Sequence, residues 1–194
     1  MSPQVQSSDL LQIECDYETS KMGVLISFGG IIMLFVTFLA TFSAMVAKEL
    51  AYIKIDGATI FVAGVTSIIL IMSSVMFHKS HSLWKKNKEA TISNYFYVSI
   101  IFGIVFLIGQ INLWKMIVNA GFTSHSNVLA GMVYLIGGVH AVHLIAGLSV
   151  LGWLWYQLIQ SRQVKPVRYQ LIGWFWHFLT ALWCIIFIFF VIIL

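Results

Sequence analysis

Residues 128–156 read VLAGMVYLIGGVHAVHLIAGLSVLGWLWY, a run of 29 residues without a single charged side chain. An α-helix rises about 1.5 Å per residue, so about 20 apolar residues are enough to cross the hydrocarbon core of a bilayer. A run of this length spans a membrane with some tilt, or projects beyond the hydrocarbon. It therefore indicates an integral membrane protein.

Four further stretches have the same character, at 23–47, 57–77, 95–114 and 169–194. Charged residues make up only 9% of the chain, whereas a soluble domain has roughly 25%. None of the seven acidic residues falls inside any of the five stretches. We expect an all-α fold: a single membrane domain, 23–194, of five transmembrane helices, after a polar cytoplasmic N-terminal tail, 1–22.

The basic residues predict the orientation of the chain. The side that holds the N-terminal tail and the second and fourth loops carries eight Lys and Arg residues, and the other side carries three: Lys48, Lys54 and Lys115. Lys and Arg accumulate in cytoplasmic loops. We therefore expect the N-terminus in the cytoplasm and the C-terminus outside, and we read the net charge of +4 as orienting the chain rather than as binding nucleic acid.

Several classes of chemistry have no support in the sequence. Cys15 and Cys184 are separated by the spans, and no Cys or His spacing typical of a metal site occurs. The first twenty residues lack the apolar segment of a cleavable signal peptide. Motifs for nucleophilic, phosphoryl-transfer and zinc-protease chemistry are absent. Glycines recur inside the spans and favour close helix packing: Gly29, Gly30, Gly103, Gly109, Gly131, Gly137, Gly138 and Gly147.

The strongest candidates for a functional site are His140 and His143 in the fourth span. Positions 136, 140, 143 and 147 lie on one face of a helix, so both imidazoles point the same way within the membrane. Ionisable side chains at such depth are rare and usually face the bundle interior. They fit three roles: neutral hydrogen-bonded packing groups, a proton relay or lipid-headgroup contact, and haem or copper ligands.

A depth count tests haem ligation. The two axial histidines of a haem must lie at nearly equal depth in the membrane. Trp155 and Tyr169 flank the fourth loop and mark the cytoplasmic headgroup level. His143 lies twelve residues from Trp155, whereas His177 lies eight residues from Tyr169. At 1.5 Å per residue the mismatch is about 6 Å, which disfavours haem binding without excluding it.

Four further aromatic and imidazole side chains are candidates for packing, lipid contact or proton relay. Trp176 and His177 form a second cluster in the last span. His78 and His81 end the second span beside several lysines. These two histidines belong either to a solvated, orienting loop or to a proton-buffering site near a neighbouring subunit's proton entrance.

These motifs together resemble those of subunit III of the haem–copper oxidases (cytochrome c oxidase) in its short five-helix form. The family pattern G-x-H-x-x-H-x-x-x-G is matched by Gly138, His140, His143 and Gly147. The pattern W-H-F-x-D-x-x-W is matched at its ends by Trp176, His177, Phe178 and Trp183. Weaker matches occur in order in the other spans: Lys21-Met22-Gly23, Ser73-Ser74-Val75 with His78, and Gly103, Gly109-Gln110 and Trp114.

Two positions depart from the family. Ile31 stands where the family usually has a glutamate, and Thr180 stands where it has an aspartate. This chain therefore lacks, at these two positions, the carboxylates that could handle protons.

The resemblance implies a subunit with no catalytic, cofactor-binding or metal-binding residue of its own, in the inner (plasma) membrane of a bacterium. Haem and copper would belong to partner subunits. Subunits I and II and membrane phospholipid would be its partners, with membership of a larger respiratory supercomplex left open. It would stabilise subunit I, bind lipid and support proton uptake in a complex that reduces dioxygen and pumps protons, with cytochrome c or a quinol as electron donor. A small b-type cytochrome or quinone-linked haem anchor is the main alternative, and a free-standing transporter is the other.

Overall fold

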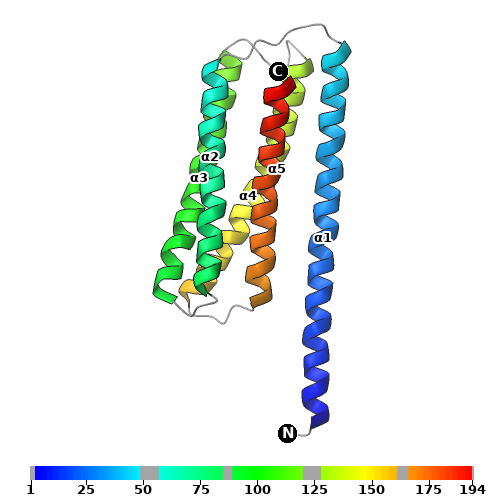
Figure 1. Cartoon of the computed structure of the whole chain (residues 1–194), viewed down its shortest axis with the longest axis vertical. Coiled ribbons are helices and arrows are strands. Elements are labelled where there is room, and N and C mark those ends of the chain that lie inside the picture. The colour runs from blue at the N-terminus through cyan, green and yellow to red at the C-terminus, as the bar shows by residue number, and fades with distance from the viewer. Residues whose placement is uncertain (1–2, 49–56, 85–88, 120–127, 161–165, 194) are drawn as a thin grey trace.

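The computed structural model describes residues 3–48, 57–84, 89–119, 128–160 and 166–193 and consists of long helices (Figure 1). They are α1 (Pro3–Lys48), α2 (Gly57–Trp84), α3 (Glu89–Asn119), α4 (Val128–Ile159) and α5 (Pro166–Ile193). All five are long and apolar enough to cross a membrane, which confirms the predicted all-α, five-helix class.

Each helix is longer than the apolar stretch that predicted it. α1 begins at Pro3 and includes the polar N-terminal segment, and α3 runs from Glu89 to Asn119 around the predicted span 95–114. Apolar composition marks only the part of a helix that lies in hydrocarbon, whereas backbone hydrogen bonding continues into the headgroup region. Both prolines begin helices, at Pro3 and Pro166, where the missing N–H costs no intrahelical bond.

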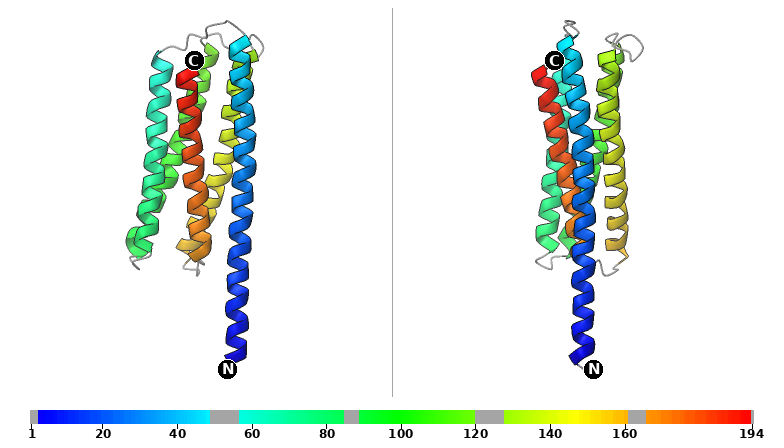
Figure 2. Two further views of the ribbon diagram at one scale, coloured as in Figure 1. Left: turned by 45° about the vertical axis from the view of Figure 1, so that its right-hand side comes forward. Right: turned by 90° about the vertical axis from the view of Figure 1, so that its right-hand side faces the viewer.

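The helices form a four-helix core with one helix attached at its side. Among the described residues α2 packs against α3 and α5, and α4 packs against α3 and α5. Within the described helices α1 contacts only α4 and α5, and Figures 1 and 2 show it standing beside the bundle with its N-terminal part projecting past the bundle's end. Of residues 17–48, only Phe35 and Phe42 are buried.

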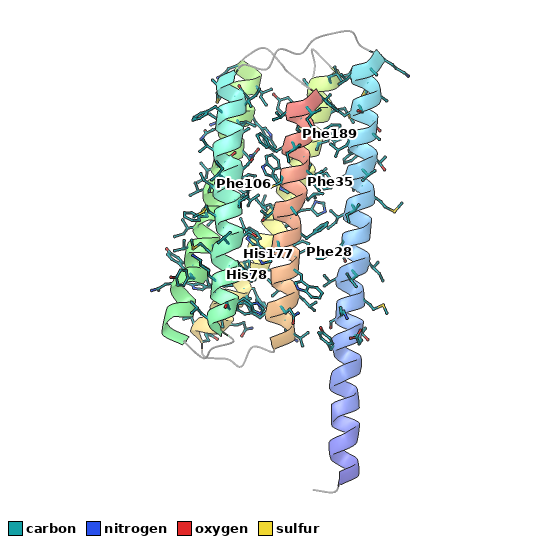
Figure 3. The ribbon with its side chains drawn as sticks, in the orientation of Figure 1. Phe28, Phe35, His78, Phe106, His177 and Phe189 are labelled. Atoms are coloured by element: carbon teal, nitrogen blue, oxygen red, sulfur yellow. The ribbon has the colours of Figure 1, made fainter. Side chains whose placement is uncertain are left out.

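Three phenylalanines, seven residues apart, hold α1 to the bundle, and two of them, Phe28 and Phe35, are labelled in Figure 3. Phe28 stacks on Phe178 of α5 with ring centroids 4.3 Å apart. Phe42 meets Phe190 of α5 edge to face at 5.4 Å. Phe35, between them, faces the histidines of α4. A seven-residue repeat keeps side chains on one side of a helix, so the three rings form a single attachment face.

Glycine lets α3 approach its neighbours closely. A Cβ added at Gly109 would lie 2.5 Å from Cγ2 of Thr66 on α2, and one at Gly103 would lie 2.8 Å from Leu148 on α4. The glycines of α1 differ, because Gly29 and Gly30 have no neighbouring atom within 4 Å of such a Cβ. Close packing at glycine, expected throughout the spans, therefore occurs within the four-helix core and not at α1.

A second seven-residue repeat supplies hydrogen bonds inside the core. Buried hydroxyls recur along α2 at Thr59, Thr66, Ser73 and Ser80. Ser73 Oγ donates to the carbonyl of Ser99 on α3 (2.6 Å), and Ser99 Oγ donates to the carbonyl of Ser73 (2.8 Å). Such interhelical bonds contribute about 0.6 kcal/mol each on average in a membrane bundle. The seven-residue spacing of these hydroxyls is visible in the sequence, but it was not among the predicted features.

Candidate functional site

His140 lies in the middle of the bundle, where α1, α4 and α5 meet. The face of α4 predicted to point inward does so, since Ile136, His140 and Gly147 are buried. The His140 imidazole is 1% exposed and lies with its ring centroid 5.0 Å from that of Trp183 on α5. Phe35 of α1 meets it edge to face at 6.2 Å. The imidazole is thus enclosed by aromatic rings from two other helices.

Neither ring nitrogen of His140 has a hydrogen-bond partner among the described residues. His143, one turn further along α4, bonds through Nδ1 to the carbonyl of Val139 in its own helix (2.7 Å) and lies 6.0 Å from the Phe35 ring. Of the two kinds of hydrogen bond expected for packing histidines, to a neighbouring helix or to a backbone carbonyl, His143 makes the second, within its own helix. What the two histidines contribute here is ring packing against α1 and α5.

His177 belongs to a second cluster between α2 and α5, nearer the end of the bundle where α2 ends and α5 begins (Figure 3). Its Nδ1 and the hydroxyl of Ser74 are 2.5 Å apart and share a hydrogen bond. The ring of His78, on the next turn of α2, lies 5.9 Å away and is exposed. The structure therefore brings together two histidines that lie 99 positions apart in the sequence, one exposed and one hydrogen-bonded in the bundle.

His81 continues this cluster toward the end of the bundle. Its ring stacks on the buried ring of Tyr169 of α5, with centroids 5.2 Å apart and an interplanar angle of 14°. The Tyr169 hydroxyl hydrogen-bonds Ser80 at 2.9 Å. His78 and His81 therefore belong to the packed α2–α5 contact, and only His78 has the exposure expected of a surface group.

The surroundings of Trp176 show that it packs helices together. It is 1% exposed, and its indole covers the positions where a Cβ would stand on Gly103 of α3 and Gly147 of α4. Its Nε1 has no hydrogen-bond partner among the described residues. Trp183, by contrast, donates from Nε1 to Ser67 Oγ on α2 (2.9 Å). The two tryptophans thus join α5 to three neighbouring helices.

The two departures from the family pattern are filled by side chains that make local contacts. Thr180 is buried, and its hydroxyl donates to the carbonyl of Trp176, one turn earlier (3.0 Å). Ile31 packs against the hydrophobic core from α1. Neither position offers a group that exchanges protons at ordinary pH.

The geometry is unfavourable for a haem between these histidines. His140 is packed directly on Trp183 and Phe35, and His177 is bonded to Ser74. A partly open pocket between α2, α3, α4 and α5 measures about 90 Å³ and has no histidine in its lining. Cofactor sites usually measure about 300 Å³ or more. In the described part of the chain no three His, Cys, Asp or Glu side chains are grouped as metal ligands.

Comparison with known proteins identifies the family. The family model of cytochrome c oxidase subunit III matches residues 18–193. Cytochrome c oxidase subunit 3 of Synechocystis sp. is 34% identical over 134 residues, covering 64% of this chain and 54% of the relative. Subunit 3 of the cytochrome bo(3) ubiquinol oxidase of Pseudomonas putida is 30% identical over 131 residues, 66% of this chain and 62% of the relative.

A longer alignment involves cytochrome c oxidase subunit 3 of Alkalihalophilus pseudofirmus, 24% identical over 166 residues, 82% of this chain and 79% of the relative. The matches to the Synechocystis and Pseudomonas proteins span about half to two thirds of those relatives. The family match covers all five helices in order, as the resemblance of the motifs predicted. This multi-pass membrane chain therefore belongs to the cytochrome c oxidase subunit III family.

Proposed function

We propose that this chain is the third subunit of a haem–copper terminal oxidase, and that it supports the complex without carrying a metal or a catalytic group. The observation that carries the proposal is the family match over residues 18–193. Haem and copper would reside in subunits I and II, against which this chain packs in a bacterial inner membrane. Relatives of both cytochrome c and ubiquinol oxidases match the chain, so the proposal covers both electron donors.

The site geometry supports an accessory role. His140, Trp176 and Trp183 are occupied in packing α1, α3 and α4 against α5, and His177 is bonded to Ser74. Side chains enclosed in this way hold the helices of the chain together and are not placed to meet a substrate. The chain would stabilise the metal-bearing subunit, bind lipid, and assist proton uptake from the cytoplasm, with its N-terminus on the cytoplasmic side.

Co-purification tests the proposal. The chain, tagged and expressed in its native membrane, should be recovered with a haem-bearing subunit whose reduced-minus-oxidised spectrum is that of an oxidase, whereas the isolated polypeptide should bind no haem. Recovery of the chain without any haem-bearing partner, or a stoichiometric haem spectrum in the isolated chain, would contradict it. The second result would favour a small b-type cytochrome or a quinone-linked haem anchor.

We propose that His78 and His81, on the proposed cytoplasmic side, assist proton uptake. Imidazole exchanges protons near neutral pH, and exposed His78 lies beside His177, so these groups suit a proton-collecting role. Changing His78 and His81 to alanine should leave the complex assembled and slow proton uptake slightly, by less than about twofold, because other pathways remain in the partner subunits. Stopped-flow proton uptake in vesicles measures the rate. Dissociation of the complex would mean that their packing on Tyr169 and His177 is their main role.

A further inference from the structure

One outward face of α3 is a stripe of apolar side chains interrupted by a single lysine. Residues spaced by four and three positions share a helix face, and here they are Ile104, Ile108, Ile111, Lys115 and Val118. The four apolar members are between 45% and 55% exposed, and Lys115 is exposed as well. In a membrane this face is available to lipid.

The distance from the start of the stripe to Lys115 matches the hydrocarbon thickness of one leaflet. Eleven residues separate Ile104 from Lys115, which at 1.5 Å per residue is about 16 Å. Half of a hydrocarbon core about 30 Å thick is about 15 Å. A stripe that begins near the bilayer midplane therefore brings the Lys115 ammonium to the depth at which the lipid headgroups begin.

A groove surrounds Lys115 at this end of the bundle. It lies between α3 and α4, has a volume of about 410 Å³, and is lined by Ile111, Trp114, Lys115, Val118, Asn119 and Tyr134. The Trp114 indole lies against α4, since a Cβ at Gly137 would be 3.3 Å from its Nε1. Indole and phenol rings settle at the headgroup level of membranes, as this position requires.

The charge of Lys115 is not balanced by the described part of the protein. In the described part of the chain the ion pair is the one between Lys21 and Glu18 on α1, and no described carboxylate pairs with Lys115. The groove thus offers one ammonium group, the Asn119 amide and two amphipathic rings above an apolar stripe. These features complement a molecule with an anionic head and an apolar tail.

We infer that the α3–α4 groove is a binding site for an anionic phospholipid. The phosphate lies at Lys115 and Asn119, the glycerol region lies against Trp114 and Tyr134, and an acyl chain follows the isoleucine stripe toward the midplane. The site is a specific case of the lipid binding proposed above. It requires that the chain spans a bilayer, and it does not depend on which subunits the chain joins.

The test uses the full-length chain in phosphatidylcholine nanodiscs that contain increasing fractions of phosphatidylglycerol with brominated acyl chains. Bromine quenches a nearby indole, and the signal of Trp114 is obtained as the difference between the protein and its Trp114→Phe variant. One lysine near a membrane surface favours an anionic lipid by an amount equivalent to about fivefold in binding. Half-maximal quenching of Trp114 should therefore occur at a brominated phosphatidylglycerol fraction about fivefold lower than with brominated phosphatidylcholine.

Two variants separate the groove from general charge attraction. Lys115→Gln should bring the preference close to one, whereas Lys48→Gln removes the same charge at the same end of the bundle, from α1, and should leave the preference unchanged. Equal quenching by both lipids in the unaltered protein, or a preference that survives Lys115→Gln, would overturn the inference. Either result would leave co-purification with a haem-bearing subunit intact, so failure of the site is distinguishable from failure of the proposed function.

Discussion

Replacing Phe28, Phe35 and Phe42 together by alanine is expected to release α1 from the bundle while α2 to α5 stay assembled. These rings contact Phe178, the two histidines of α4 and Phe190, and they include both buried side chains of residues 17–48. In a bilayer the hydrophobic effect does not hold helices together, so packing of this kind must do so. Aromatic pairs contribute about 0.5–1.5 kcal/mol each, so the three should together contribute about 3 kcal/mol.

Distances between spin labels measure the release directly. With the native cysteines replaced by serine, one label pair at Met33 and Ile188 reports on α1 relative to α5, and a second pair at Ile68 and Ile188 reports on α2 relative to α5. All three positions are more than half exposed, so labels there disturb little packing. The triple variant should broaden the distance distribution of the first pair and leave the second narrow.

A largely exposed phenylalanine provides the control. Phe61 on α2 is 72% exposed, so Phe61→Ala removes the same group without removing packing and should leave both distributions narrow. A narrow α1–α5 distribution in the triple variant would show that α1 is held by something other than these rings.

The attachment of α1 illustrates what the sequence could not predict. The five helices were predictable because each contains about 20 or more apolar residues, a strong and local signal. The phenylalanine repeat at 28, 35 and 42 is equally visible, but spacing within one helix does not identify the helix that it meets. That information lies in tertiary packing.

The candidate site, too, was predictable only in part: the face of the helix was predictable, but the contact partners were not. Helical spacing correctly placed His140 and Gly147 on the inward face of α4. The partners of the histidines were not predictable, because the contacts of His177 with Ser74 and of His140 with Trp183 join residues far apart in the chain. One sequence contains no signal that pairs such positions. The glycines show the same limit, since Gly109 packs tightly on Thr66 while Gly30 faces open space.

The second large expected effect is that the same substitution changes the free energy of unfolding in opposite directions at two histidines. His140→Leu should raise this free energy, and His177→Leu should lower it. Both nitrogens of His140 are buried without a described hydrogen-bond partner. Burying an unpaired polar group costs about 1–3 kcal/mol, so an apolar side chain of similar size removes that cost. Leucine also retains contact with the apolar faces of Phe35 and Trp183.

His177 differs because its hydrogen bond would be lost. Leucine at this position leaves the Ser74 hydroxyl without the Nδ1 atom that lies 2.5 Å away, and it removes the ring that packs beside His78. Interhelical hydrogen bonds in membrane bundles contribute about 0.6 kcal/mol on average and up to about 1.7 kcal/mol. His177→Leu should therefore destabilise the bundle by about 1 kcal/mol.

Unfolding of the purified chain in mixed micelles, with increasing mole fraction of sodium dodecyl sulfate, measures both changes under one condition. Opposite signs would separate the hydrogen-bond effect from a general response to replacing a histidine inside the membrane, because the two substitutions are chemically identical. A loss of stability in both variants would mean that a water molecule completes the hydrogen bonding of His140. Stabilisation that occurs in the isolated chain and reverses in the assembled complex would instead mean that a neighbouring subunit provides the missing partner, and His140 would then act at the interface between subunits.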